Sequence, residues 1–374
     1  MAGIYIHIPY CRQVCRYCDF HFTVSVWQIK ELLPCIIKEI EDRKEYLNHE
    51  TIDTIYFGGG TPSILDNKEM ESILDSIYKY YHVSEKVEVS FEANPEDLKK
   101  EYLKILFRSG INRLSIGIQS FQNEDLKLMH RIHNGEQAIQ SVKDAKEAGF
   151  ENISIDLIYG IPQQEAGIWE RNLETAILLG VQHFSAYHLT FEARTVFDHW
   201  RKKGRITPIP EEVSINQFKT LEEKSIQIGF EHYEISNFAK PGYQSRHNLS
   251  YWEQKKYLGI GPSAHSYNLV SRRWNVSNNN KYINYIISGA DYFETEILTA
   301  DDHYNELVMT SLRTSKGISL IQIMNQCGEE RAKYFKSRIQ RFIGSGHVRV
   351  EQETYRLTSE GIFIADYLIS EVFV

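Results

Sequence analysis

The sequence has no excess of basic residues, because 42 Lys and Arg stand against 50 Asp and Glu among 374 residues, a formal net charge of −8. A nucleic-acid-binding protein usually has a basic face, so we expect no polynucleotide partner. The chain also lacks an uninterrupted run of 18 apolar residues, and its N-terminus lacks a basic region followed by a cleavage site. We therefore expect neither a membrane span nor export.

Cysteine is scarce, and its distribution is uneven. Three of the five cysteines, Cys11, Cys15 and Cys18, fall in one short loop, while Cys35 and Cys327 stand alone. An odd number with this clustering does not indicate a disulfide framework, and thiolate-bound iron needs a reducing compartment. We expect a cytoplasmic protein in which the two isolated thiols are buried and structural.

The three clustered cysteines follow an apolar, strand-like run with the spacing C-x3-C-x2-C. Three thiolates can hold three irons of a cubane 4Fe-4S cluster and leave the fourth iron open, whereas electron-transfer ferredoxins bring four cysteines. An open metal position can bind a substrate. The alternative is a zinc loop completed by a nearby histidine, for which His7 and His21 are close enough in sequence.

The first 230 residues alternate between short β-like runs and helical spans. The β-like runs are residues 3–8, 51–57, 86–92, 113–118, 152–158 and 183–189. Helical patterns occupy parts of the intervening segments, and residues 187–200 resemble a connector before a helix at 211–229. Six strands separated by helices predict parallel βαβ units, and their polar residues gather at the strand ends where barrel enzymes build sites. We predict an α/β fold, a partial (β/α)6 TIM-type barrel over residues 1–230.

The rest of the chain has a different pattern. Residues 231–251 are rich in Tyr, Asn and His and poor in helical periodicity, which indicates a functional surface segment. A glycine-rich turn follows at residues 259–266. We predict a connecting segment over residues 231–299 and a small C-terminal helical, winged-helix-like domain over residues 300–374, with late β-like pieces at 347–351 and 355–358.

The cysteine loop resembles the signature of the radical S-adenosylmethionine (SAM) superfamily. The resemblance implies that the open iron chelates the amino and carboxylate groups of SAM. The run Gly58-Gly59-Gly60-Thr61-Pro62, some 40 residues later, is similar to the superfamily's glycine motif, which meets the SAM amino group through backbone oxygens. By itself the run could be a tight strand-helix turn.

Two further segments narrow the resemblance. They are residues 5–11 with 18–20 (YIHIPYC and CDF), and residues 233–238 with 247–252 (YEISNF and HNLSYW). With the late residues 312–314 and 317–318, they resemble the coproporphyrinogen dehydrogenase, or HemN-like, family along nearly the whole chain, and most closely its heme-chaperone branch. The enzyme branch continues its loop as C-x3-C-x2-C-x-C, but this chain has Phe20 where the fourth cysteine would stand.

The resemblance also implies ligand positions. An arginine suits the SAM carboxylate, and strand-end carboxylates suit ribose hydroxyls. The HemN-like pattern places SAM contacts at Tyr5, Gly59, Gly60, Thr61, Glu92, Gln119, Arg131 and Asp156, and Tyr17 lies inside the cluster loop.

The H-N-x-x-Y-W motif is associated with heme in the chaperone branch. His247 could be the axial ligand of heme iron, while Tyr251 and Trp252 could stack on the porphyrin. A lone histidine beside aromatic residues is more often a packed, hydrogen-bonded side chain. His265, in the glycine-rich turn, is a rival ligand.

The resemblance favours a heme chaperone that binds a 4Fe-4S cluster and SAM, holds heme, and transfers it to apo-hemoproteins, with those of respiration as candidate clients. The alternative is an oxygen-independent coproporphyrinogen III oxidase that converts propionates to vinyl groups by radical decarboxylation. A third interpretation is a radical SAM scaffold that acts on an unrelated small molecule.

Overall fold

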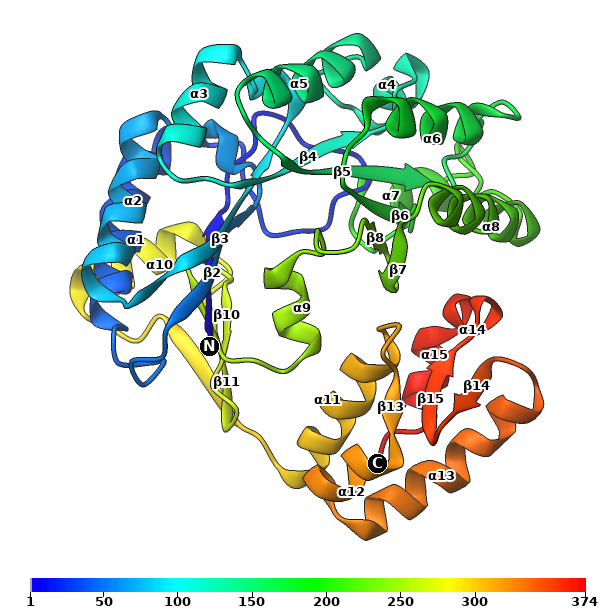
Figure 1. The fold of residues 1–374 in the computed structure, drawn as a ribbon. Coiled ribbons are helices and arrows are strands. Elements are labelled where there is room, and N and C mark those ends of the chain that lie inside the picture. The colour runs from blue at the N-terminus through cyan, green and yellow to red at the C-terminus, as the bar shows by residue number, and fades with distance from the viewer. Residues whose placement is uncertain (1) are drawn as a thin grey trace.

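The computed structural model describes residues 2–374 and contains the six parallel strands that the sequence predicts (Figure 1). They lie side by side in chain order: β1 (Ala2–Ile8), β2 (Ile52–Gly59), β3 (Val83–Ala93), β4 (Arg113–Gln119), β5 (Asn152–Tyr159) and β6 (His183–His188). The partial-barrel prediction is confirmed.

Helices connect these strands and cover the outer face of the sheet (Figure 1). The connecting elements are η1 (Val26–Gln28), α1 (Ile29–Asp42), η2 (Pro62–Ile64), α2 (Asn67–Tyr80), η3 (Pro95–Asp97), α3 (Lys100–Arg108), α4 (Asn123–Met129), α5 (Gly135–Glu147) and α6 (Ile168–Leu179). After β6 come α7 (Val196–Lys202), which begins within the predicted connector and ends beyond it, and α8 (Glu211–Gln227). Because both faces of the parallel strands are covered, every residue of β4 is buried.

Local signals fix where several helices begin. Asp66 and Glu69 form a reciprocal capping box at the start of α2, and Asn134 with Gln137 does the same for α5. Each pair satisfies backbone N–H groups that have no partner within the helix.

The sheet extends beyond the barrel on both edges, which the strand pattern did not predict. Its order is β12-β11-β10-β9-β1-β2-β3-β4-β5-β6-β8-β7. The added strands are β7 (Glu231–Glu234), β8 (Asn237–Ala239), β9 (Tyr257–Ile260), β10 (His265–Tyr267), β11 (Ser271–Asn275) and β12 (Phe293–Ile297). Strand β9 runs parallel to β1, and β10 to β12 continue antiparallel, with α10 (Asn279–Ser288) between β11 and β12.

Residues 231–251, which we expect to be a functional surface segment, form regular elements in which several residues are buried. The segment contains β7 and β8, and its end enters the helix α9 (Arg246–Trp252). Both His247 and Ser250 are buried in this helix, which packs against the inner side of β1, β2 and β3. Seven residues are too few to show helical periodicity, so pattern analysis could not find α9.

The C-terminal residues form a unit with its own hydrophobic core, centred on Tyr304, Val308, Phe335 and Leu368. Its elements are α11 (Ala300–Leu312), β13 (Ile318–Ser319), α12 (Leu320–Cys327), α13 (Glu329–Gly344), β14 (Val348–Glu351), β15 (Thr354–Leu357), α14 (Ser359–Phe363) and α15 (Ala365–Ser370). The three strands pair antiparallel in the order β13-β15-β14, the helix and strand sequence expected for a winged helix. In the view of Figure 1 this unit lies below the barrel, beyond α9.

Across residues 2–374, no helix combines the length and apolar character needed to cross a bilayer.

Candidate functional site

The cysteine loop leaves β1 at the carboxyl end of the parallel sheet and is anchored by backbone hydrogen bonds. Cys11 N donates to Thr23 O at 2.9 Å, and Thr23 N donates to Pro9 O at 2.8 Å, so the two ends of the loop close on each other. Arg16 N donates to Met129 O at 3.1 Å, which ties the middle of the loop to the end of α4. These backbone hydrogen bonds fix both the ends and the middle of the loop.

All three cysteines of the loop are free thiols and line a cavity of about 560 Å³, here called the barrel cavity. Burial raises the pKa of Cys11 to about 11 and that of Cys18 to about 12. Iron binding to these side chains would therefore release protons, because a thiolate is the ligand form. Within residues 2–374, no group of three or more His, Cys, Asp or Glu is placed to hold a single metal ion.

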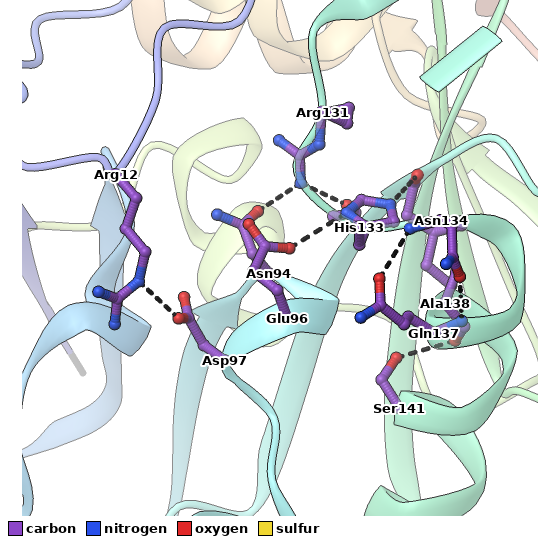
Figure 2. Close-up of polar contacts among 12 residues, drawn as sticks. Arg12, Asn94, Glu96, Asp97, Arg131, His133, Asn134, Gln137, Ala138 and Ser141 are labelled. Atoms are coloured by element: carbon purple, nitrogen blue, oxygen red, sulfur yellow. Dashed lines mark hydrogen bonds and ion pairs between the residues drawn. The ribbon is translucent and has the colours of Figure 1, made fainter. Parts of the chain in front are cut away.

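Two side chains contact the cysteine sulfurs. Thr61 Oγ1 donates to Cys11 Sγ at 3.4 Å, and Arg131 Nη1 donates to Cys15 Sγ at 3.4 Å. Arg131 Nη2 donates to Asn94 Oδ1 (Figure 2) and to the carbonyl of Gly117. The amide of Asn94 donates to Thr61 Oγ1 at 3.2 Å. Thr61, Asn94 and Arg131 therefore form a hydrogen-bonded bridge between two cysteines of the loop.

The glycines after β2 allow close backbone packing against β1. A Cβ on Gly60 would lie 2.7 Å from the carbonyl oxygen of Tyr10 and 2.9 Å from that of Ile8. Gly59 has a φ of +108°, and a Cβ there would lie 2.6 Å from the His7 ring. The glycine run is required by the path of the cysteine loop, whatever ligand it also meets.

Two half-buried carboxyl groups line the barrel cavity, Glu92 near the end of β3 and Asp156 within β5. Glu92 accepts a hydrogen bond from Tyr56 at 2.7 Å, yet burial, with Asp156 nearby, raises its pKa to about 7. Asp156 accepts from Ser115 Oγ at 3.2 Å, and burial raises its pKa to about 6. These carboxyl groups are poised to accept hydrogen bonds from a polar ligand that displaces water.

Most of the residues that the resemblance implied for SAM meet in this one cavity. Gln119 is one of these residues, and its backbone has a positive φ of 67°. A positive φ is rare for a residue other than glycine and is typical of functional sites. The predicted residues that line the barrel cavity are Tyr17, Gly59, Gly60, Thr61, Glu92, Gln119, Arg131 and Asp156, together with the three cysteines.

Tyr5 is the exception, because it lines a second cavity. Its hydroxyl is hydrogen-bonded to His7 Nδ1 at 3.0 Å. Sequence reasoning missed Asn94 and Ser115, which line the barrel cavity. Asn94 lies two positions after Glu92 at the same strand end, so the alternation of side chains along β3 was the available signal.

The second cavity, of about 500 Å³, lies between the barrel, the β9–β11 extension and α11. Tyr251 and Trp252 of the H-N-x-x-Y-W motif line it, and so does His265. The two cavities share Phe20, Gly59 and Glu92 as lining residues, and Phe20 is 69% exposed.

His247 does not line either cavity. Its ring is fully buried, with Nδ1 hydrogen-bonded to Thr54 Oγ1 at 2.8 Å and Nε2 to the hydroxyl of Tyr251 at 2.9 Å. Burial lowers its pKa to about 3. The ring also stacks on Tyr56, with ring centres 5.0 Å apart. This is the packed, hydrogen-bonded state of a structural histidine, and iron ligation would require the ring to give up one of these bonds.

Comparison with known proteins gives the family. The chain matches the radical SAM superfamily over residues 5–175 and the HemN C-terminal domain over residues 298–364. It is 34% identical to the heme chaperone HemW of Bacillus subtilis over 364 residues, which cover 96% of each chain. The chain belongs to the HemW family. A HemW of Mycobacterium tuberculosis is 31% identical over 374 residues, covering 98% of this chain and 93% of the relative.

HemW-family membership within the radical SAM superfamily implies a 4Fe-4S cluster and SAM. The fold is also that of coproporphyrinogen III oxidase (HemN) from Escherichia coli, described as a radical SAM enzyme, with a TM-score of 0.87 over 100% of this chain and 90% of that one. The two chains are 21% identical, so this likeness concerns the fold.

Proposed function

We propose that this protein is a heme chaperone that binds a 4Fe-4S cluster and SAM in the barrel cavity, holds heme in the second cavity, and transfers it to apo-hemoproteins. The observation that carries the proposal is that Tyr251 and Trp252, two residues of the heme-associated motif, line a second cavity beside the cysteine loop. Its volume of about 500 Å³ is in the range of cofactor sites.

The residues of the barrel cavity fit a cluster. Three free thiols line one wall, and hydroxyl and guanidinium donors already contact two of the sulfurs. When bound, a cluster held by three cysteines supplies one open iron that can take the amino and carboxylate groups of SAM. We assign Cys11, Cys15 and Cys18 as its ligands.

The remaining residues of this cavity fit SAM. Arg131 supplies a buried guanidinium suited to a carboxylate, and Glu92 and Asp156 supply carboxyl groups for ribose hydroxyls. We propose that the protein acts in the cytoplasm, because thiolate-bound iron requires a reducing compartment.

The second candidate function is an oxygen-independent coproporphyrinogen III oxidase. It is favoured by the barrel cavity, which holds all but one of the residues expected to contact SAM. Against it, Phe20 occupies the position of the fourth cysteine of the enzyme branch.

The test is an anaerobic heme titration of cluster-reconstituted protein, followed in the Soret region, with release of 5'-deoxyadenosine quantified in the same samples. Saturable heme binding without substantial SAM cleavage, followed by transfer of heme to an apo-hemoprotein, supports the chaperone. Absence of heme binding, with deoxyadenosine and carbon dioxide released on addition of coproporphyrinogen III, would identify the oxidase.

A further inference from the structure

Three histidines line the second cavity, and they differ in what their ring nitrogens contact. His7 is hydrogen-bonded at both, to the hydroxyl of Tyr5 at 3.0 Å and to the carbonyl of His21 at 3.1 Å. His21 is bonded through Nε2 to Asn279 at 2.9 Å. Within residues 2–374, neither ring nitrogen of His265 has a hydrogen-bond partner. His265 is therefore the cavity histidine with both nitrogens available to a ligand.

The backbone that carries His265 is held firmly. The next residue, Ser266, accepts a hydrogen bond from the buried Arg43 at 3.1 Å, and Arg43 is paired with the fully buried Glu39. Glu39 also accepts from Gly261 N at 2.8 Å, so one buried carboxylate fixes the turn from both ends. The side chain of His265 is exposed while its attachment point is fixed, which is the arrangement of a pre-positioned ligand.

The His265 ring is also oriented. It lies opposite Trp274 in the β10–β11 pair, with ring centres 6.1 Å apart and an angle of 28° between the planes. Partial burial of the ring, with a contribution from Arg272, lowers the pKa of His265. The neutral ring is the form that binds a metal.

The walls around this histidine suit a flat, largely apolar molecule with a polar edge. Aromatic rings of Tyr251, Trp252, Tyr257 and Tyr267 line the cavity, and the Trp252 indole N–H is buried without a partner within residues 2–374. Arg272, paired with Glu306 at 2.8 Å, brings a guanidinium to the same wall. Aromatic faces stack on a macrocycle, and a guanidinium recognises carboxylates such as propionates.

We propose that His265 is the axial protein ligand of heme iron in the second cavity, and that His247 supports the site by fixing Tyr251. The proposal rests on the heme-chaperone function above and names the site within it. His247 holds the hydroxyl of Tyr251, four residues later on the same face of α9, while Tyr251 itself borders the cavity.

The experiment is a Soret-region heme titration of the full-length, cluster-reconstituted protein and five single variants. His265→Ala and His265→Gln test the ligand, His21→Ala tests the second cavity histidine, and His247→Ala tests the motif. His82→Ala is the control, because His82 is exposed and lines neither cavity. Iron-sulfur absorbance is measured for every variant to verify that the barrel is intact.

We expect both His265 variants to lose roughly tenfold or more in heme affinity and to lose the histidine-ligated spectrum. Free imidazole added to His265→Ala should restore that spectrum. His82→Ala should match the unsubstituted protein, and His247→Ala should retain the histidine-ligated spectrum.

An unchanged spectrum in both His265 variants overturns the ligand proposal while leaving the chaperone function standing. Loss of the histidine-ligated spectrum in His247→Ala or His21→Ala, with His265→Ala unaffected, moves the ligand to that residue. Absence of heme binding by the unsubstituted protein overturns the chaperone function itself, so the two failures are distinguishable.

Discussion

Asn94 holds Arg131 beside the cysteine loop, since Arg131 Nη2 donates to Asn94 Oδ1 (Figure 2) while Nη1 of the same guanidinium lies 3.4 Å from Cys15 Sγ. The amide nitrogen of Asn94 reaches Thr61, whose hydroxyl contacts Cys11. One uncharged side chain therefore sets the positions of both donors that face the sulfurs.

Replacing Asn94 should change the electronic properties of the cluster. Hydrogen bonds to ligand sulfurs raise the reduction potential of an iron-sulfur cluster. We expect Asn94→Ala to loosen both donors and shift the midpoint potential in the negative direction, measured by a redox titration followed by electron paramagnetic resonance. Asn305→Ala, which changes a half-buried asparagine of α11 that contacts Val374 and lines neither cavity, is the control. Equal potentials in both variants would contradict a role for the bridge.

Replacing any cysteine of the loop should abolish the cluster. We expect Cys11→Ala, Cys15→Ala and Cys18→Ala each to lose the broad iron-sulfur absorbance and most of the bound iron and sulfide, because three thiolates are the minimum set. Cys327→Ala, which removes a free thiol outside both cavities, is the control and should retain full iron content. A loop variant with a full complement of iron and sulfide would remove the cluster assignment.

Adding one methyl group at Gly60 should disturb the cysteine loop. The new Cβ would lie 2.7 Å from Tyr10 O and 2.8 Å from Tyr10 N, and neither backbone atom can move freely within the packed sheet. We expect Gly60→Ala to lower the free energy of unfolding by about 1–3 kcal/mol and to reduce cluster content. Gly344→Ala, in α13, meets nothing within 4 Å and should be neutral or slightly stabilising. Denaturant unfolding and iron analysis of both variants make the comparison.

Asp156 should make the ligand-free protein less stable as pH rises. Its pKa is raised from 3.8 to about 6, so the folded state holds the proton more tightly than the unfolded chain does, and stability is lost between these two values. We expect Asp156→Asn to raise the free energy of unfolding at pH 7.5 by up to about 3 kcal/mol, since one pKa unit corresponds to about 1.4 kcal/mol. The difference should disappear below about pH 4.

The same variant should bind SAM less tightly if the carboxylate accepts hydrogen bonds from the ligand. Stability and binding are therefore predicted to change in opposite directions, and both are measured on one preparation. A variant with the same pH profile as the unsubstituted protein would show that Asp156 ionises normally.

The sequence predicted those parts of the fold in which pattern and burial agree. Strands β1 to β6 are flanked by helices and are apolar enough to stand out, whereas β12 (Phe293–Ile297) is largely exposed and β8 and β10 have three residues each. Such short edge strands form because a neighbouring strand is already present, which is information that lies elsewhere in the chain.

The motifs identified the residues of the candidate site more reliably than they indicated the positions of the side chains. His247 and Trp252 are five positions apart in one motif, yet the turn of α9 directs His247 toward Thr54 in the barrel wall and leaves Trp252 at the second cavity. Asn94 belongs to no motif and was missed, although it connects two residues that were predicted.

Phe20 has a consequence for how the two cavities are filled. This exposed side chain borders both cavities. The occupants of the two cavities therefore face the same Phe20 ring and the same rotamer. A ligand in the barrel cavity that selects one orientation of the Phe20 ring changes the affinity of the second cavity for its own ligand by some factor. By thermodynamic reciprocity, the ligand of the second cavity changes the affinity of the barrel cavity by the same factor. If the protein carries heme as proposed, the loading and release of heme are thermodynamically linked to the occupancy of the neighbouring cavity.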